Sequence, residues 1–508
     1  MSPSAHGECM VLNSGDEVDL DFGTYERTLG VRLTHAHNLS MGKTYRSVIE
    51  KERRGEYLGA TVQMVPHVSD ELEASIDSLA HIPVDPARPG LEPDVLVIEL
   101  GGTVGDIESI LPLEALRRMR YRMGSENFAH VHVVLVPGLG PLEELKTKLA
   151  QHAVAELRKA GHSPDLLFCR SPSPLPPSIK TKLSQFCSLP AERVISMHDL
   201  SSLYRLPIVL ADQGVGHFLL QQLGHPRDKE YANSLLRRWE ALATQEELPE
   251  SKVRIVKIAL VGKYVGSTDS YMSVVKALEH AGAANGVRVK LSWISAGDLE
   301  DETLCAEAMT QLHAADGVLV PGGFGVRGTE GLVRAINYAR TQKVPFFGVC
   351  LGFQLAVVEY ARNVLGWTRA TSAEFDTDDK SGQQHVIVNM PEISSTHLGG
   401  TMRLGSRTAS LTPGTLASQI YGGATQVDER HRHRYEVNPV HIKALADAGL
   451  VFGAVDHKEH VRMECLELSE HPFFFGTQSH PEFNSGPFAP SAPFCAFVAA
   501  ASARRQLK

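Results

Sequence analysis

The stretch VPFFGVCLGFQLAVVEYARNVLG, residues 344–366, predicts the fold of the half of the chain that contains it. Its apolar start suits a buried strand, and the glycines on either side of Cys350 permit a sharp turn. After the turn, apolar residues recur with a helical period at Leu351, Leu355, Val358 and Leu365. A strand, a G-x-C-x-G turn and a helix together predict a nucleophile elbow with cysteine in place of serine.

An elbow of this kind would activate Cys350. The turn places the sulfur near a helix N-terminus, whose partial positive charge favours the thiolate over the thiol. Taken alone, the pattern also fits a buried cysteine after a core strand, because buried cysteines are common. The rest of the same half of the chain favours the catalytic interpretation.

A cysteine nucleophile needs a base, and the base needs a group that orients it. The segment HPFFFGTQ, residues 471–478, predicts a strand, and His480 would follow its end. Glu482 lies two residues later and could hold the imidazole. A lone histidine is more often structural, but His-Pro-Glu after a strand is a more specific pattern.

A third element is VLVPGGFG, residues 318–325, a short apolar strand that runs into glycines. Backbone N–H groups in such a turn could hold an oxyanion. An ordinary glycine turn is the alternative for this segment considered alone.

These three elements, in this order, resemble a class I glutamine amidotransferase domain, in which cysteine attacks the side-chain amide of glutamine and releases ammonia through a thioester. The resemblance implies that Cys350, His480 and Glu482 form the triad and that Gly323 and Leu351 hold the oxyanion. It also implies that glutamine is bound by Gln354, Glu374 and Arg434. Arginine suits an α-carboxylate and a carboxylate suits an α-ammonium. The run from Arg430 to Arg434 could otherwise be a solvated basic patch.

The composition excludes several classes of protein. At 508 residues more than one domain is expected, and no apolar run approaches the length of a membrane span. The first ten residues lack the basic and apolar regions of a signal peptide. The net charge of −9 disfavours a nucleic-acid polymer as partner. Seven cysteines without C-x-x-C spacing indicate a reducing, cytoplasmic setting.

The first half predicts a second doubly wound α/β domain. DVLVIELGGTVG, residues 94–105, reads as an apolar strand ending at Glu99, followed by a glycine turn and acidic residues. Further strands are expected at 131–137, 164–170 and 193–199, with helical segments between them. Acidic residues and lysines near the ends of parallel strands suit a cation and phosphates. Together with a source of ammonia, they suggest ATP-driven amination of a phosphorylated acceptor.

Specific strings extend the resemblance along nearly the whole chain to the CTP synthase family. They are HGECMVLNSGDEVDLDFGTYER, KERRGEYLGATVQMVPH, VIELGGTVGDIES, KTKLAQ, PGGFGVRGTEG and GGTMRLG. The family implies that ATP phosphorylates the uracil 4-oxygen of UTP and that ammonia from glutamine displaces the phosphate to give CTP. It also implies Mg²⁺ as cofactor, GTP as allosteric activator, CTP as feedback inhibitor, and a homotetramer that could form filaments.

The resemblance assigns residues in the first half as well. Asp21 and Glu99 resemble the magnesium ligands. The residues that resemble nucleotide contacts are Asp106, Ile107 and Glu108 for CTP, Lys146, Thr147, Lys148, Gln151 and Lys182 for the UTP triphosphate, and His198, Asp199 and Leu200 near adenine.

The chain also departs from the family pattern. Family members have a strand and a glycine-rich phosphate loop roughly fifty residues upstream of the position of Met1, and Gly42-Lys43-Thr44 lacks the spacing of a replacement. We therefore expect an N-terminally truncated synthase domain at 1–243, a linker at 244–254 and an amidotransferase domain at 255–503. Three hypotheses follow: a CTP synthase, an amidotransferase that feeds another acceptor, and a truncated paralogue or splice form with impaired synthase activity that acts as a regulatory or assembly subunit.

Overall fold

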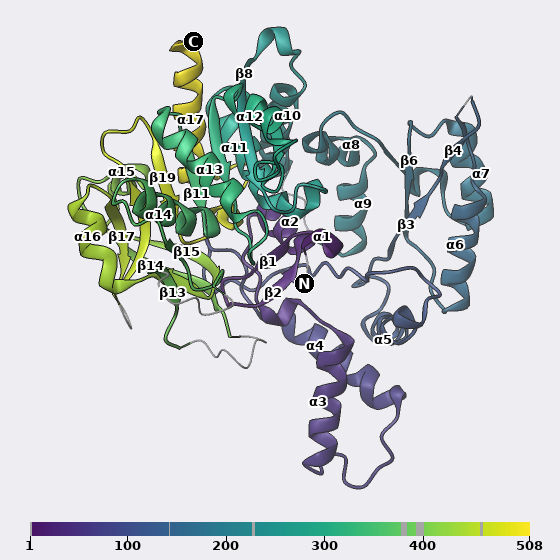
Figure 1. Cartoon of the computed structure of the whole chain (residues 1–508). Coiled ribbons are helices and arrows are strands. Elements are labelled where there is room, and N and C mark those ends of the chain that lie inside the picture. Colours follow the sequence, from purple (N-terminus) through teal and green to yellow (C-terminus); the bar gives the residue numbers. More distant parts are fainter. Residues whose placement is uncertain are drawn as a thin grey trace. The chain divides into compact units, whose positions relative to one another are not determined.

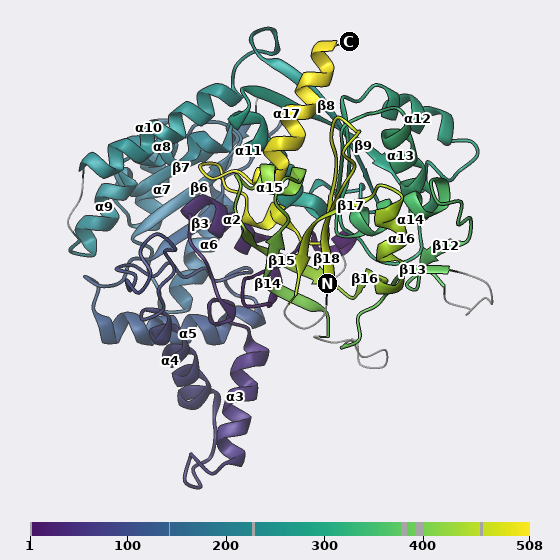
Figure 2. The ribbon, with the colours of Figure 1, turned by 90° about the vertical axis from the view of Figure 1, so that its left-hand side faces the viewer.

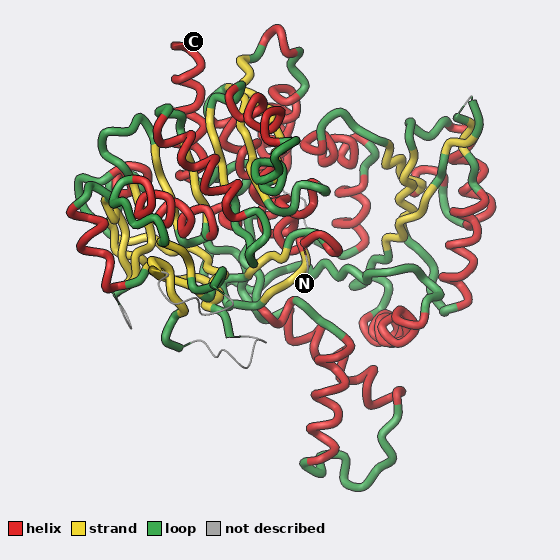
Figure 3. The backbone as a smooth tube through the Cα atoms, in the orientation of Figure 1, coloured by secondary structure: helices red, strands yellow, loops and turns green. Residues whose placement is uncertain are grey.

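The computed structural model describes residues 3–141, 143–225, 229–376, 384–392, 401–457 and 461–507. The contacts divide the chain into two compact units. Unit 1 comprises residues 1–38, 84–89 and 249–508, and unit 2 comprises residues 39–83 and 90–248. Each unit has its own strands and helices (Figure 3). In the described part of the chain, no helix has the length and apolar character that a membrane crossing requires.

Unit 1 is built on one mixed sheet, which has nine strands among the described residues. Five parallel strands form one part, in the order β9 (Val287–Ser295), β8 (Arg254–Gly262), β10 (Gly317–Val320), β11 (Phe346–Val349) and β19 (Phe474–Thr477). Antiparallel strands continue it as β18 (Arg462–Glu467), β17 (Val451–Asp456), β14 (Arg403–Leu411) and β15 (Gln426–His433). A smaller sheet joins β12 (Ala370–Ser372), β13 (Gln384–Asn389) and β16 (Tyr435–Val437).

Helices cover both faces of the parallel strands (Figures 1 and 2). Residues of α12 (Cys305–His313), α13 (Thr329–Thr341) and α14 (Leu351–Asn363) share one buried apolar cluster with the strands. Residues of α11 (Met272–Ala284) and α17 (Ala492–Leu507) share the other. Two short helices, α15 (Leu416–Ile420) and α16 (Ile442–Asp447), lie near the antiparallel strands. This is the α/β architecture that the sequence predicts.

The N-terminal segment packs within unit 1. The strands β1 (Cys9–Val11) and β2 (Glu17–Asp19) pair antiparallel, and α2 (Leu20–Leu29) follows them. The side chain of Arg430 on β15 is 0% exposed and pairs with Glu26 of α2. The neighbouring His431 and His433 are buried too. The alternative of a solvated basic patch at 430–434 is therefore wrong, because these side chains are enclosed by the N-terminal segment and the sheet.

Unit 2 contains a parallel sheet of β3 (Val131–Leu135), β6 (Leu166–Ser171) and β7 (Val194–His198), which confirms the three strands expected there. A hairpin of β4 (Gly138–Leu139) and β5 (Glu144–Leu145) follows β3. The helices of this unit are α3 (Met41–Arg53), α4 (Ser69–Leu79), α5 (Ile107–Met123), α6 (Lys148–Lys159), α7 (Pro177–Cys187), α8 (Leu206–Asp212), α9 (Val215–Gln222) and α10 (Lys229–Glu246).

One expected strand does not form. Residues 94–100 carry no strand assignment, although DVLVIE is as apolar as a core strand. The side chain of Val97 is 83% exposed. A strand needs a neighbour for its backbone N–H and C=O groups, and among the described residues this run is hydrogen-bonded into no sheet. The expectation failed because periodicity reports apolar character but not the pairing partner.

Candidate active site

The turn between β11 and α14 has the geometry of a nucleophile elbow. Cys350 adopts φ 52° and ψ −97°, a conformation that few residues with a side chain occupy. A Cβ on Gly348 would lie 2.7 Å from the carbonyl carbon of Gly352, and a Cβ on Gly352 would lie 2.2 Å from the carbonyl oxygen of Val320. Both glycines are therefore required by close backbone contacts, and the turn presents Cys350 at the N-terminus of α14.

The predicted base and its orienting group lie beside this cysteine. Nδ1 of His480 is 2.7 Å from Oε1 of Glu482, and both side chains are buried. Burial lowers the pKa of His480, but the carboxylate of Glu482 and the sulfur of Cys350 outweigh it and raise this pKa to about 10. The raised pKa favours the imidazolium form, which suits a general acid beside a cysteine nucleophile.

Strand β15 supplies backbone contacts to both catalytic side chains. The backbone N–H of His480 donates to the carbonyl of Arg430 over 2.7 Å. The thiol of Cys350 lies 3.6 Å from the carbonyl oxygen of Arg432. Alternate carbonyls of one strand therefore fix the positions of the nucleophile and the base.

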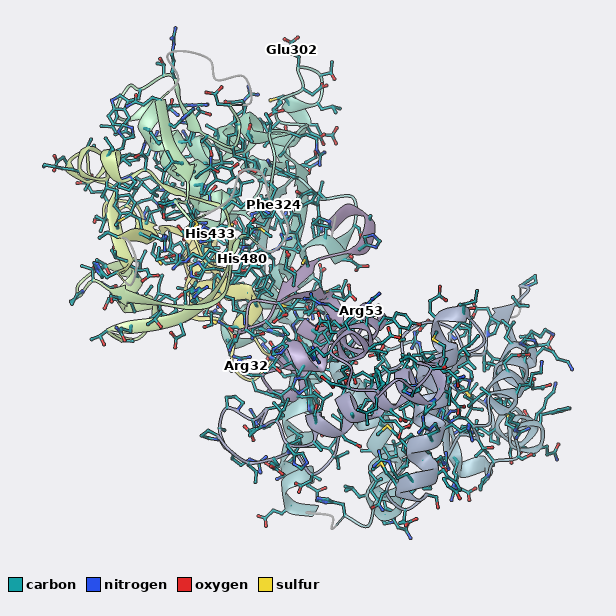
Figure 4. All side chains as sticks on the ribbon, turned by 90° about the horizontal axis from the view of Figure 1, so that it is seen from below. Arg32, Arg53, Glu302, Phe324, His433 and His480 are labelled. Carbon is teal, nitrogen blue, oxygen red and sulfur yellow. The ribbon has the colours of Figure 1, made fainter. Side chains whose placement is uncertain are left out.

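The predicted oxyanion donors lie next to the elbow. Gly323 follows β10, the parallel neighbour of β11, and Leu351 is the first residue of α14. A Cβ on Gly323 would lie 3.2 Å from Cδ2 of Leu351. The N–H groups of a first helical turn have no partner within the helix, so that of Leu351 suits an anion. Figure 4 labels Phe324 of the same loop together with His433 and His480 of unit 1.

The residues expected to hold glutamine are in the same unit. Oε1 of Glu374 accepts a hydrogen bond of 2.7 Å from the N–H of Gly325. Burial raises the pKa of Glu374, while that N–H, Lys263 and Arg434 oppose the shift. Arg434 also donates to Thr401 Oγ1 over 2.9 Å. A carboxylate can bind the α-ammonium of an amino acid, and a guanidinium can bind its α-carboxylate. The charge of Arg434 lowers the pKa of Glu374, so both groups belong to one region of the unit.

Gln354 makes a contact that sequence reasoning missed. Its Nε2 donates to the side-chain oxygen of Gln478 and to the carbonyl of Tyr435, each over 3.1 Å. Nε2 of Gln478 in turn lies 3.7 Å from Sγ of Cys350. The only available signal was the position of Gln478 two residues before His480.

A cavity of unit 1 connects the triad with the N-terminal segment. Cys350, His480 and Glu482 line it together with Glu8 and Cys9. Burial raises the pKa of Glu8 to about 7, although Oγ of Ser273 donates to its carboxylate. The sequence carried no signal for Glu8, because residues 8 and 350 meet only in the folded unit.

Most of the predicted nucleotide residues of unit 2 lie at or just after the ends of its strands or in the first turn of its helices, whereas Lys182 lies in the middle of α7. Lys146 forms an ion pair of 2.6 Å with Glu144, whose pKa is lowered first by Lys146 and also by Lys182. Gln151 donates to Thr147 over 3.0 Å, and Lys148 starts α6. His198 ends β7, and Asp199 pairs with Arg170 over 2.9 Å. Lys146 and Lys182, both predicted to contact the UTP triphosphate, therefore lie close enough to Glu144 to lower its pKa.

The start of α5 contains the three residues predicted to contact CTP, Asp106, Ile107 and Glu108, and the side chain of Ile107 is 85% exposed.

The two predicted magnesium ligands belong to different units, Asp21 to unit 1 and Glu99 to unit 2. Among the described residues, no group of three or more His, Cys, Asp or Glu is arranged to hold a metal ion. Carboxylates are ligands that Mg²⁺ accepts, together with waters and substrate phosphates.

Comparison with known proteins extends these observations to both units. Residues 1–225 match the family model "CTP synthase N-terminus", and residues 267–500 match "Glutamine amidotransferase class-I". The chain is 49% identical to CTP synthase 1 from Homo sapiens over 99% of its own length and 85% of that protein. It is 46% identical to CTP synthase from Dictyostelium discoideum, over 99% of its length and 91% of that protein.

Among solved structures, the glutaminase domain of Trypanosoma brucei CTPS with bound acivicin is 38% identical, with a TM-score of 0.46, and covers 49% of this chain and 94% of that one. The curated relatives span both halves, which does not favour an amidotransferase for another acceptor or an impaired paralogue. With both family models matched and near-complete coverage by named relatives, the chain belongs to the CTP synthase family, the glutamine-hydrolysing ligases that convert UTP to CTP.

Proposed function

We propose that Cys350, His480 and Glu482 are the catalytic triad of the glutaminase reaction in this enzyme. The single observation that carries the proposal is the strained elbow of Cys350 beside the buried His480–Glu482 pair. The thiolate attacks the carboxamide carbon of glutamine. His480 then protonates the leaving nitrogen, so ammonia departs and a thioester remains. His480 next takes a proton from water, which hydrolyses the thioester to glutamate.

The backbone N–H groups of Gly323 and Leu351 hold the oxyanion of each tetrahedral intermediate. Their nearness to the elbow supports this role. Such donors act on charge that develops only in the transition state, and losing one costs about 10²–10³ in kcat in comparable enzymes.

Glutamine is held by Gln354, Glu374 and Arg434. Glu374 meets the α-ammonium and Arg434 meets the α-carboxylate, which is the charge pairing that an amino acid requires. Gln354 faces the carboxamide end through its link to Gln478 and Cys350.

The synthase reaction uses the nucleotide residues of the first half. ATP activates the uracil 4-oxygen of UTP, and ammonia replaces the phosphate. Asp106, Ile107 and Glu108 bind CTP as feedback inhibitor. The UTP triphosphate contacts Lys146, Thr147, Lys148, Gln151 and Lys182, and His198, Asp199 and Leu200 lie near adenine. Asp21 and Glu99 hold Mg²⁺, which would neutralise phosphate charge.

The remaining proposals rest on the family. GTP activates glutamine hydrolysis, the enzyme works in the cytoplasm, and the subunits form a homotetramer that could assemble into filaments. The functional boundary lies at 244–254, between the synthase domain at 1–243 and the amidotransferase domain at 255–503, and the gap between the two family matches supports it.

Cys350→Ala tests the triad. Glutamine-dependent CTP formation should fall by at least about 10⁴-fold, since the mutant has no nucleophile, while CTP formation from free ammonia should persist. Cys495→Ala, in a half-buried cysteine on α17, is the matched control and should keep both activities. A Cys350→Ala protein that still hydrolyses glutamine would refute the assignment.

A further inference from the structure

Lys263 is a buried cation beside the oxyanion loop, residues 322–325. It directly follows β8, which pairs with β10, the strand that leads into this loop. The side chain is 6% exposed. Its Nζ donates to the carbonyl of Gly325 and, over 3.4 Å, to that of Phe324. Burying an ammonium group without hydrogen-bond partners costs free energy, so these two carbonyls hold Nζ in one position.

The stem of Lys263 also supports the loop. Its Cδ lies 3.5 Å from the position that a Cβ on Gly323 would occupy. The backbone carbonyl of Lys263 accepts a hydrogen bond of 2.7 Å from Arg327, on the far side of the loop. Lys263 thus lies against Gly323, whose N–H is proposed to hold the oxyanion, and is hydrogen-bonded to the residues that follow it.

Gly325 links this cation to the carboxylate that is proposed to bind glutamine. Its carbonyl accepts from Nζ of Lys263, and its N–H donates to Oε1 of Glu374. Burial lowers the pKa of Lys263 to about 8, Glu374 and Glu300 oppose this shift, and Arg327 adds to it. Burial raises the pKa of Glu374, and the Gly325 N–H, Lys263 and Arg434 each lower it. Without the Lys263 charge, the carboxylate would keep its proton to a higher pH.

We propose that Lys263 is a positioning residue for glutamine hydrolysis, which fixes the oxyanion loop through two carbonyls and supplies a positive charge next to Glu374, the proposed partner of the substrate α-ammonium. The inference rests on the proposed roles of Gly323 and Glu374. Lys263 itself touches neither the reacting atoms nor the α-ammonium. An apolar residue of similar length could fill the space but could supply neither the hydrogen bonds nor the charge.

The two roles separate in three variants. Lys263→Met removes donor and charge, Lys263→Gln keeps a donor without charge, and Lys263→Arg keeps the charge in a different shape. Lys257→Met, on β8 itself, is the matched control. Each protein is assayed as the full chain for glutamine hydrolysis between pH 5.5 and 9.5, and folding is checked by thermal unfolding.

In Lys263→Met, kcat should fall by about 10-fold or more, less than the loss of an oxyanion donor itself. The KM for glutamine should rise steeply on the acid side, and the acid limb of kcat/KM should move up by about one pH unit, because a nearby opposite charge shifts a carboxyl pKa by that order. Lys263→Gln should show the same limb shift with a smaller loss of kcat. Lys263→Arg should leave the limb in place.

Other titratable side chains also lie in this region, notably His480 and Tyr435. Glu374→Gln isolates the effect, since adding Lys263→Met to it should move the acid limb no further. An unmoved limb and unchanged kcat in Lys263→Met and Lys263→Gln would overturn the inference while an inactive Cys350→Ala keeps the triad. If Lys263→Met fails to fold, the comparison of Lys263→Gln with Lys263→Arg tests the inference. An acid limb of kcat/KM at the same pH in these two variants would overturn the charge role.

Discussion

At the scale of single residues, the active site depends on two glycines that serve no chemical role. Gly348 and Gly352 lack side chains because the backbone of a neighbouring strand or turn occupies that space. The G-x-C-x-G pattern is therefore a steric requirement of the elbow. The nucleophile between them is the residue that carries the unusual φ.

Gly352→Ala tests this steric reading. The added methyl would lie 2.2 Å from the carbonyl oxygen of Val320, so β10 and the elbow must move apart. We expect a destabilisation of about 1–3 kcal/mol or more, measured by denaturant unfolding, and loss of most glutaminase activity. Gly42→Ala is the control, because the space around Gly42 is open and we expect stability and activity to stay nearly unchanged. Gly366→Ala would be unsuitable, because the φ of 72° at Gly366 would strain any residue with a side chain. Wild-type activity in Gly352→Ala would contradict the elbow geometry.

Glu482→Gln tests the electrostatics of the base. The carboxylate raises the pKa of His480, so its removal should lower that pKa toward the value that burial favours. The imidazolium persists only below this pKa, and the alkaline limb of the glutaminase pH profile should therefore move to lower pH. We also expect kcat to fall by about 10²–10⁴-fold. Glu470→Gln, at an exposed turn, is the control, and an unmoved alkaline limb would count against the pairing.

At the scale of elements, β15 links the catalytic centre to the N-terminal segment. Its carbonyl at Arg430 accepts from the backbone N–H of His480, and its carbonyl at Arg432 lies near the sulfur of Cys350. The side chain of Arg430 contacts the N-terminal segment instead. That guanidinium lies 2.7 Å from Glu26, 2.6 Å from Asn13 Oδ1 and 3.0 Å from the Val11 carbonyl. Arg430 therefore couples the position of the triad to residues that lie more than four hundred positions before Arg430 in the sequence.

Arg430→Met should be strongly destabilising. It leaves Glu26, which is 1% exposed, as an unpaired buried carboxylate, and breaking such a pair costs about 3–5 kcal/mol. The measurement is the free energy of unfolding of unit 1, followed by its near-ultraviolet circular dichroism. The double variant Arg430→Met/Glu26→Leu should recover much of this loss, because it removes both charges. A double variant as unstable as the single one would show that packing, and not the charge, is responsible.

At the scale of the whole molecule, the synthase reaction is proposed to need Mg²⁺, with Asp21 and Glu99 as its protein ligands. Asp21→Asn and Glu99→Gln should each raise the Mg²⁺ concentration needed for ammonia-dependent CTP formation by at least about tenfold, since each removes one of few protein ligands. Magnesium titrations of CTP formation measure this. Asp19→Asn, an exposed neighbour, is the control, and unchanged titrations in both variants would remove Asp21 and Glu99 from the metal site.

The sequence alone determined the α/β class, the elbow at Cys350 and the pairing of His480 with Glu482. These are local patterns, in which periodicity, glycines and short spacing act within a few residues. It could not determine the roles of Lys263, Gln478 and Glu26, or the missing strand at 94–100. Those features depend on which distant segments meet, since a buried charge takes its meaning from its partner and a strand forms only beside another strand. Only the tertiary structure decides those partners, because chain folding brings together residues whose separation in sequence carries no signal.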